Sequence, residues 1–346
     1  MPGTYEDLDE ADLVVLVGSN LAWCHPVLYQ RVLAARERRG TKIVVIDPRR
    51  TASCDQADLH LALEPGSDVA LFNYLLTQIY EGGALDNAYL QHVEGFDEAL
   101  HAAYADTVDV TGLDRSLIDR FCALWMGHEK VVTVFSQGVN QSTSGTDKVN
   151  SIINCHLATG RIGTLGCGPL SVTGQPNAMG GREVGGLANM LACHLDLENA
   201  AHRATVQQFW GAGPLPQSAG LKAVDMLRAV GDGTIKALWI IHTNPAVSMP
   251  DADAVAAAIA GCDFTVVSDI TAHTDTARCA DVLLPATAWA EKSGTVTNSD
   301  RTISRQRAVL SPPGMARHDW EILADVGRRM GWTKAFDYEG PAEIFR

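Results

Sequence analysis

Polar side chains suited to a large polar ligand interrupt one glycine-rich stretch in the middle of the chain. The stretch, Gly160–Gly186, contains nine glycines in 27 residues. A dense run of glycine lets the backbone approach a ligand closely or turn at positive φ. The side chains between the glycines offer amides, a thioether and a guanidinium for binding; they are Gln175, Asn177, Met179 and Arg182. An ordinary loop between two domains is the alternative interpretation, and the flanking segments decide between the two.

Three more polar clusters stand in the first half of the chain, at Gly18–Asn20, Asp47–Arg49 and Pro65–Asp68. A carboxylate such as that of Asp47 is suited to accept hydrogen bonds from a ribose or a guanine edge. A guanidinium such as that of Arg49 is suited to a phosphate. These residue types together predict a nucleotide site. The alternative is that Asp47 and Arg49 only cap the chain and pair with each other at the surface.

The pattern of hydrophobic residues predicts the strands and helices that would position these clusters. The apolar, β-branched run at residues 11–18 predicts a parallel strand buried on both faces, and residues 41–46 predict a second one. Residues 26–39 have helical spacing closed by Gly40, and residues 68–80 form a further amphipathic pattern. Strand, helix and strand in this order make a βαβ unit, in which ligands bind at the carboxyl ends of the strands. The three clusters are therefore expected on one rim.

A further strand is predicted at residues 130–135, and amide side chains again follow it, at Gln137 and Gln141. Residues 147–160 then predict a helix that leads into the glycine-rich stretch. His156 on this helix is interpreted as a core or surface histidine and not as a ligand.

The second half of the chain repeats the pattern of the first. Residues 236–241 and 263–267 predict strands, and residues 252–260 predict the helix between them. Residues 280–285 then match the segment 57–65 of the first half.

The polar corners recur at a similar spacing. Asn20 and Asp47 are 27 residues apart, and Asn244 and Asp269 are 25 residues apart. A shared period with shared polar corners indicates duplicated nucleotide-binding halves. Such halves would hold two similar ligands or both arms of one ligand, while chance resemblance of two βαβ units is the alternative.

A turn-rich polar stretch follows the second unit and contains Glu291, Lys292, Asn298 and Arg301. These four side chains are either solvated surface groups or ligand contacts. Asp319, at the start of a later predicted helix, either belongs to its N-terminal cap or reaches a ligand at the same rim.

Composition bounds the class of protein. With 346 residues, of which 46% are hydrophobic and 20% charged, two globular domains are expected. The net charge of −14 argues against nucleic acid and anionic membrane surfaces as partners. Met1–Asp12 has no secretory pattern, and no apolar run is long enough to span a bilayer. The eight dispersed cysteines form no C-x-x-C pair, so we expect reduced, mostly buried thiols in a cytoplasmic protein.

In this order, the polar segments resemble the molybdopterin oxidoreductase family that uses two molybdopterin guanine dinucleotides, and within it the central part of the catalytic subunit of assimilatory nitrate reductases. The matching segments run along almost the whole chain. They are GSNLAWCHP from Gly18, IDPRRT from Ile46, PGSD from Pro65, GVNQS from Gly138, GCGPLSVTGQPNAMGGREVG from Gly166, TNP from Thr243, SD from Ser268 and EKSGTVTNSDR from Glu291.

This resemblance implies an α/β fold with two Rossmann-like lobes of parallel sheet flanked by helices, and molybdenum-dependent reduction of nitrate to nitrite. Met179 and Arg182 would lie near the molybdenum, where the guanidinium would orient an anionic substrate. The other matched positions would bind the guanosine and pyrophosphate arms of the cofactor. They are Gly18, Ser19, Asn20, Cys24, His25, Asp47, Pro48, Arg49, Gly66, Ser67, Asp68, Gln137, Gln141, Gly174, Gln175, Asn244, Ser268, Asp269, Lys292 and Asp319.

The sequence also departs from the family's pattern. By comparison with that pattern, we expect these 346 residues to lack the N-terminal segment that holds an iron–sulfur cluster, the cysteine that ligates molybdenum and the C-terminal domain. Neither Cys24 nor Cys167 occupies the metal-ligand position. We therefore expect a first lobe over residues 1–165, a second lobe with the glycine-rich loop over 166–346, and no nitrate reductase activity in the isolated chain.

Other functions remain open at this point. A formate dehydrogenase core shares closely related cofactor motifs, and a non-catalytic nucleotide-binding subunit would keep the same lobes. An NAD(P)-dependent dehydrogenase is disfavoured, because no G-x-G-x-x-G follows the first strand. For a nitrate reductase the expected partners are nitrate and an electron donor such as ferredoxin or a reductase subunit.

Overall fold

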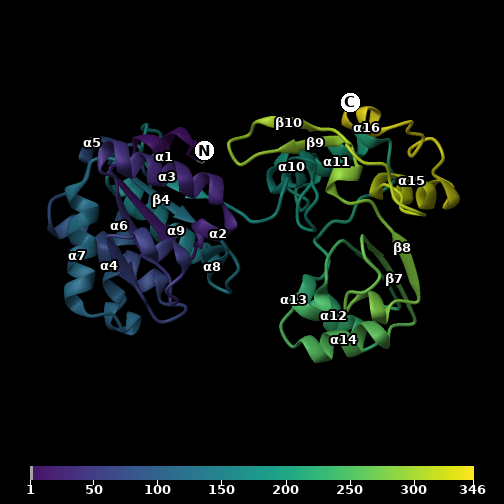
Figure 1. Cartoon of the computed structure of the whole chain (residues 1–346), viewed down its shortest axis with the longest axis horizontal. Helices are drawn as coiled ribbons and strands as arrows, with labels where there is room; N and C mark the ends of the chain where they lie inside the picture. The colour runs from purple at the N-terminus through teal and green to yellow at the C-terminus, as the bar shows by residue number, and fades with distance from the viewer. Residues whose placement is uncertain (1–2) are drawn as a thin grey trace. The chain divides into compact units, whose positions relative to one another are not determined.

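The protein is described here by a computed structural model, which covers residues 3–346 of the chain. The chain divides into two compact units, Met1–Pro176 and Asn177–Arg346 (Figure 1). The division therefore falls inside the glycine-rich stretch Gly160–Gly186. None of the helices in the described part of the chain is both long enough and apolar enough to cross a lipid bilayer.

The first unit is built on a sheet of five parallel strands in the order β3-β2-β1-β4-β5. The central strand β1 pairs with β2 through Val15 and Val44 and with β4 through Val15 and Thr133. All five residues of β1 are fully buried, as the apolar run predicts. The strands are β1 (Leu13–Val17), β2 (Lys42–Ile46), β3 (Leu59–Leu61), β4 (Val131–Phe135) and β5 (Gly168–Ser171).

Helices cover both faces of this sheet. On one face Leu13, Val15 and Val17 pack in a cluster with residues of α4, α7 and α9, and on the other face Val14 and Leu16 pack against α3. The helices are α1 (Glu6–Glu10), α2 (Leu21–Cys24), α3 (Pro26–Arg39), α4 (Asp68–Glu81), α5 (Asn87–Leu90), α6 (Phe96–Ala105), α7 (Arg115–Gly127), α8 (Gln137–Asn140) and α9 (Gly145–Ala158), with 3-10 turns η1 (Ala52–Gln56) and η2 (Val108–Thr111).

The predicted helix over residues 26–39 is confirmed at both ends. Pro26 opens α3 with a fixed φ that suits a first turn, and Gly40 ends it in the left-handed region at φ +78°. His156 is confirmed as a core residue of α9, where its Nε2 lies 2.8 Å from Thr133 Oγ1. Burial, together with the nearby Arg161 charge, holds the pKa of His156 well below its ordinary value.

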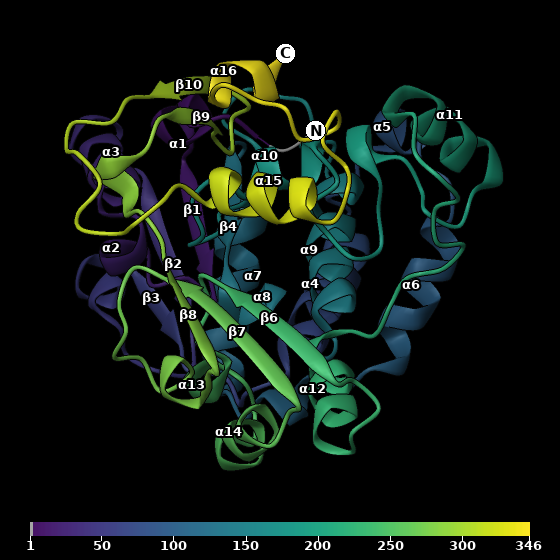
Figure 2. The same cartoon turned by 90° about the vertical axis from the view of Figure 1, so that its right-hand side faces the viewer.

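The second unit contains a smaller parallel sheet in the order β6-β7-β8. Its strands are β6 (Ala237–Ile241), β7 (Phe264–Asp269) and β8 (Val282–Pro285). The helices α12 (Ala223–Gly231), α13 (Pro245–Ser248) and α14 (Ala252–Ala260) lie together beside it (Figure 2). Leu227, Val255, Ile259 and Val267 are part of the core between these helices and the sheet. The predicted α/β fold with parallel sheets flanked by helices is thus confirmed.

The rest of the second unit comprises a two-stranded antiparallel hairpin and several short helices. The hairpin pairs β9 (Gly294–Thr297) with β10 (Ile303–Gln306). The helices are α10 (Ala178–Glu183), α11 (Ala200–Trp210), α15 (Asp319–Arg329) and α16 (Pro341–Phe345), with 3-10 turns η3 (Ala192–His194), η4 (Ala277–Cys279) and η5 (Trp289–Glu291).

The two sheets share local bonding as well as strand order. In the first unit the Asp58 carboxylate accepts a hydrogen bond from Ile43 N at 2.9 Å. In the second unit the Asp281 carboxylate accepts one from Thr265 N at 2.7 Å. Each aspartate directly precedes the third strand of its repeat and bonds to the second strand. The matching contacts support the internal repeat that the sequence predicts.

Candidate functional site

The loops that follow the strands of the first unit surround a cleft of about 540 Å³. It lies at the carboxyl ends of β1, β2 and β4, the edge at which parallel sheets bind ligands. Ten of the residues that sequence analysis selected line it: Gly18, Asn20, Cys24, Asp47, Pro48, Arg49, Gly66, Asp68, Gln137 and Gln141. The structure therefore brings the three predicted polar clusters of the first half together.

Two glycines let the backbone form one side of this cleft. A Cβ on Gly138 would lie 2.6 Å from the Gly18 Cα, and a Cβ on Gly18 would lie 2.7 Å from the Gly138 Cα. Gly18 also has φ +51°, and Gly138 N donates to its carbonyl at 3.0 Å. A side chain at either position would separate the loops after β1 and β4. The pair keeps bare backbone exposed to whatever occupies the cleft.

The Asp47 side chain shapes the loop after β2 and does not pair with the neighbouring guanidinium. Its Oδ1 accepts a hydrogen bond from the backbone N–H of Arg49 at 2.9 Å, and the Asp47 residue is buried. Within residues 3–346 the exposed Arg49 guanidinium has no ion pair or hydrogen bond. Arg50, in contrast, pairs with Asp55 at 3.3 Å. Arg49 is thus a cation at the cleft that is available to an anionic ligand.

A buried ion pair lies at the cleft and was not predicted from sequence. Lys148 Nζ of α9 lies 2.7 Å from Asp68 Oδ2 at the start of α4, with side chains 5% and 10% exposed. Lys148 Nζ is also 3.5 Å from the Gly138 carbonyl oxygen. One feature of the sequence could have indicated that Lys148 is buried. At helical spacing it falls on the same face of α9 as Ser151, Ile152 and Cys155, which are buried.

The remaining sequence-selected residues of the first unit lie beside the cleft. Ser19 Oγ and His25 Nδ1 are buried with no hydrogen-bond partner among the described residues. His25 Nε2 donates to the Thr173 carbonyl at 2.8 Å, which fixes the segment just before Gly174. Ser67 Oγ donates to the Glu64 carbonyl at 2.7 Å.

An amide pair also joins the glycine-rich stretch to this loop cluster. Gln137 Nε2 donates to Gln175 Oε1 at 2.9 Å. Gly174 and Gln175 are both exposed. They therefore lie next to a cleft residue while their backbone stays accessible.

In the second unit, the corner at Asn244 repeats the bonding of the corner at Asn20. Ser53 Oγ donates to Asn20 Oδ1 at 3.2 Å and accepts from Ala22 N at 3.0 Å. Thr276 Oγ1 donates to Asn244 Oδ1 at 2.7 Å and accepts from Ala246 N at 3.1 Å. Each fully buried hydroxyl thus holds an asparagine at the end of the first strand of its repeat.

Ser268 and Asp269 end β7 as predicted, and both are already bonded within the unit. Trp239 Nε1 donates to Ser268 Oγ at 2.9 Å, and Ile270 N donates to Asp269 Oδ1 at 2.6 Å. The carboxylate of Asp269 has further acceptor positions, because each carboxylate offers about four.

Lys292 and Asp319, far apart in sequence, form an ion pair in the second unit. Lys292 Nζ lies 2.8 Å from Asp319 Oδ2, and His242 Nε2 lies 2.5 Å from Asp319 Oδ1. Burial alone would raise the pKa of Asp319, but the hydrogen bond from Lys292 and the nearby His242 and Lys292 charges hold this pKa below its ordinary value. Sequence analysis missed His242, which adjoins the matched TNP segment but is not part of it.

Met179 and Arg182 lie three positions apart on α10, so they share one side of this short helix. Asn177 Oδ1 and Glu183 Oε2 tie the helix to β9 by accepting from Thr297 N at 2.8 Å and from Thr297 Oγ1 at 3.2 Å. The Arg182 side chain is exposed, and its guanidinium makes no hydrogen bond or ion pair within residues 3–346.

The expectation that the cysteines are mostly buried was wrong for half of them. Cys54, Cys122, Cys155 and Cys167 are buried, but Cys24 and Cys193 are exposed and the other two are partly exposed. Cys24 is exposed because α2 presents it to the cleft instead of packing it on the sheet. All eight thiols are free.

Comparison with known proteins shows the family of the chain. The chain belongs to the molybdopterin oxidoreductase family, whose model matches residues 2–329. It is 50% identical to a nitrate reductase of Klebsiella oxytoca over 346 residues, covering all of this chain and 40% of that protein. It is 34% identical to the alpha subunit of an F420-dependent formate dehydrogenase of Methanocaldococcus jannaschii, covering all of this chain and 51% of that subunit. The chain thus spans about half the length, or less, of these relatives.

A solved structure shares the fold. The acetylene hydratase of Pelobacter acetylenicus superposes with a TM-score of 0.73 at 18% sequence identity, over 98% of this chain and 52% of that chain. Membership of the family implies a molybdenum-pterin cofactor.

Proposed function

We propose that this chain forms the cofactor-binding core of a molybdenum-dependent nitrate reductase and holds two molybdopterin guanine dinucleotides. The observation that carries the proposal is the cleft after β1, β2 and β4, in which matched family motifs from four loops meet. The identity of 50% to a nitrate reductase supports nitrate as the substrate. A relative from Bacillus subtilis named as an assimilatory nitrate reductase catalytic subunit is 35% identical, and this likeness supports a cytoplasmic enzyme. The electron donor in this proposal is ferredoxin or a reductase subunit.

The residues of the first unit fit a nucleotide-bearing cofactor. The close contact of Gly18 and Gly138 forms a cradle that a Cβ would fill, so a pyrophosphate could approach the backbone closely there. Within residues 3–346 the Arg49 guanidinium is unpaired and could bind phosphate, and the buried Ser19 hydroxyl has no hydrogen-bond partner. In the second unit the same roles would fall to Asn244, Ser268, Asp269, Lys292 and Asp319.

When bound, the cofactor supplies two-electron oxygen-atom transfer, which reduces nitrate to nitrite. The protein binds and orients the reactants. Arg182, which is exposed and unpaired in the described chain, would bind the anionic substrate through two parallel N–H groups. Met179, on the same side of α10, would cover the substrate with an apolar thioether. The ties from Asn177 and Glu183 to Thr297 would keep α10 in place.

A formate dehydrogenase core is the second candidate, because the chain is 34% identical to such a subunit. Assays of the complete protein with reduced viologen and nitrate, and with oxidised viologen and formate, separate the two candidates. We expect nitrite formation without formate oxidation. Formate oxidation without nitrite formation would reject the nitrate proposal.

Two neighbouring arginines provide a matched test of the cleft itself. Arg49→Ala removes the unpaired guanidinium, while Arg50→Ala removes one that is already paired with Asp55. We expect Arg49→Ala to weaken binding of GMP to the chain roughly tenfold or more, the effect of losing a charge-assisted hydrogen bond. Arg50→Ala is expected to bind GMP like the wild type. Equal affinity of the two variants would remove Arg49 from the proposed site.

A further inference from the structure

The backbone of His242 adopts a conformation that is unusual for a residue with a side chain. Its φ is +52°, in the left-handed region that favours glycine. His242 directly follows β6, and its N–H donates to the Ser268 carbonyl at the end of β7 at 2.9 Å. A strained backbone conformation of this kind persists only where the surrounding structure stabilises it, and such conformations are concentrated at functional sites.

Among the described residues, the His242 side chain makes one hydrogen bond. His242 Nε2 lies 2.5 Å from Asp319 Oδ1, and because a carboxylate accepts, the imidazole donates. Lys292 Nζ donates to the other oxygen of the same carboxylate at 2.8 Å. The three residues come from the end of β6, the segment after η5 and the first position of α15.

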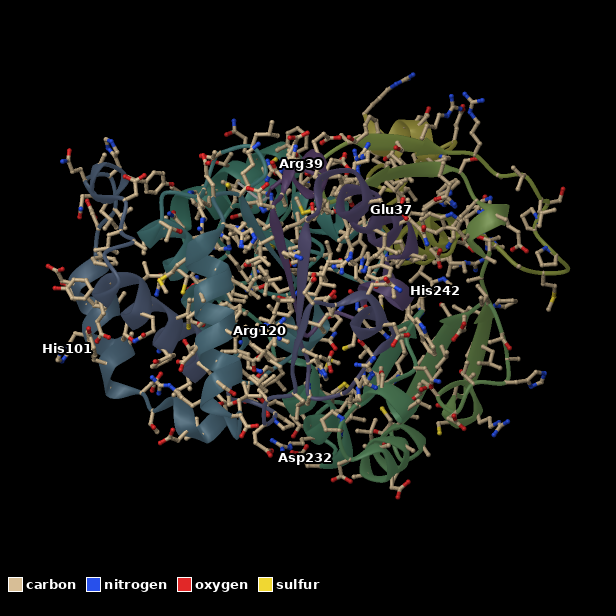
Figure 3. All side chains as sticks on the ribbon, turned by 60° about the vertical axis from the view of Figure 1, so that its left-hand side comes forward. Glu37, Arg39, His101, Arg120, Asp232 and His242 are labelled. Carbon is tan, nitrogen blue, oxygen red and sulfur yellow. The ribbon has the colours of Figure 1, made fainter. Side chains whose placement is uncertain are left out.

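This group of three remains accessible to a ligand. The side chains of His242, Asp319 and Lys292 are 30%, 26% and 27% exposed. Each oxygen of Asp319 accepts one hydrogen bond and keeps capacity for another, and the ammonium of Lys292 has two more donors. His242 lies where the green strands of the second unit end (Figure 3). This is the edge of a parallel sheet at which ligands bind.

We propose that His242 is a positioning residue that orients the Asp319–Lys292 pair toward the nucleotide arm of the cofactor bound by the second unit. The inference rests on the proposed function for the identity of the ligand. Lys292 alone leaves Asp319 free to rotate about its side-chain torsions, and the second donor from His242 fixes the plane of the carboxylate. The residual acceptor positions of Asp319 then point in one direction.

A purely structural role is the competing explanation, in which His242 only ties the start of α15 to the sheet. Glycine at position 242 separates the two roles, because it removes the imidazole and also relieves the backbone strain. His242→Gln restores a donor of similar reach. Asp251→Gly serves as a control, since Asp251 has φ +57° before α14 and makes no side-chain cap hydrogen bond.

The first experiment measures GMP affinity by calorimetry and thermal unfolding on the full chain. For His242→Gly we expect about a tenfold loss of affinity, typical of a lost charge-assisted contact, with an unfolding temperature equal to or above that of the wild type. His242→Gln should recover part of the affinity, and Asp251→Gly should bind like the wild type. Unchanged affinity in His242→Gly, with or without a lower unfolding temperature, would overturn the proposal.

The second experiment follows the titration of the Asp319 carboxyl by carbon NMR and needs no nucleotide. In His242→Gly the pKa of Asp319 should rise toward its ordinary value of 3.8, because one of the groups that lower it is gone. An unchanged Asp319 pKa would show that His242 does not hold the carboxylate. If the wild type fails to bind GMP, the proposed function is wrong for both units, and the titration still decides whether His242 positions Asp319.

Discussion

The ion pair between Lys148 and Asp68 allows a quantitative prediction for the first unit. Lys148→Met keeps most of the aliphatic volume of the side chain and removes the charge. At 2.7 Å and an effective dielectric constant of about 20, the lost Coulomb attraction is about 6 kcal/mol. Desolvation of both ions in the wild type offsets much of this attraction, so the cost of breaking such a buried pair is about 3–5 kcal/mol.

Because of the position of Asp68 in the fold, we expect a destabilisation at the lower end of this range. Asp68 begins the 14-residue helix α4, where backbone N–H groups and the helix dipole stabilise a carboxylate by about 1 kcal/mol. We therefore expect Lys148→Met to destabilise the first unit by about 3 kcal/mol. In the double variant Lys148→Met/Asp68→Asn no unpaired charge remains, and about half of that loss should be recovered.

Native-state hydrogen exchange of amides in α4 and α9 is the appropriate assay, because it reports on the first unit alone. Lys42→Met is the control: Lys42 pairs with Asp58 at 3.4 Å, but its side chain is 47% exposed, so a loss below about 1 kcal/mol is expected. A cost for Lys148→Met no larger than that of Lys42→Met would refute the account of the pair. So would a double variant as unstable as the sum of its single variants.

Two further predictions concern the internal repeat. Thr276→Val should destabilise the second unit by about 1–3 kcal/mol, because Asn244 Oδ1 and Ala246 N lose a buried hydroxyl partner, and hydrogen exchange in α13 checks this. Asp58→Asn should be destabilising at neutral pH but not in acid. Although burial opposes the shift, Arg36 and the Ile43 N–H lower the pKa of folded Asp58 below 3.8, so its stabilising effect exists above the unfolded pKa and disappears as pH falls through the folded pKa. Urea unfolding of Asp58→Asn and wild type at both pH values tests the sign.

Most of the fold follows from local patterns in the sequence. Each of two elements is predicted by a pattern within its own residues. Leu13–Val17 is a continuous apolar, β-branched run, and Pro26–Arg39 has helical spacing between Pro26 and Gly40. The cleft was also predictable, because parallel topology alone brings the loops after β1, β2 and β4 to one edge.

The side-chain partners at the site could not be predicted in this way. Lys148 and Asp68 meet only because α4 and α9 pack side by side on one face of the sheet. His242 reaches Asp319 because of a single left-handed residue, and histidine has no strong sequence signal for that conformation. Both contacts depend on tertiary packing, which hydrophobic periodicity does not encode.

The most direct test of the central claim is the content of molybdenum and of acid-releasable GMP in the chain. The protein would be purified from a host that makes the guanine dinucleotide cofactor, with Gly138→Val as a variant whose side chain would occupy the space beside Gly18. The account predicts molybdenum together with about two GMP per chain, and a loss of GMP in Gly138→Val. A chain that carries no GMP and also fails to bind added GMP would contradict it.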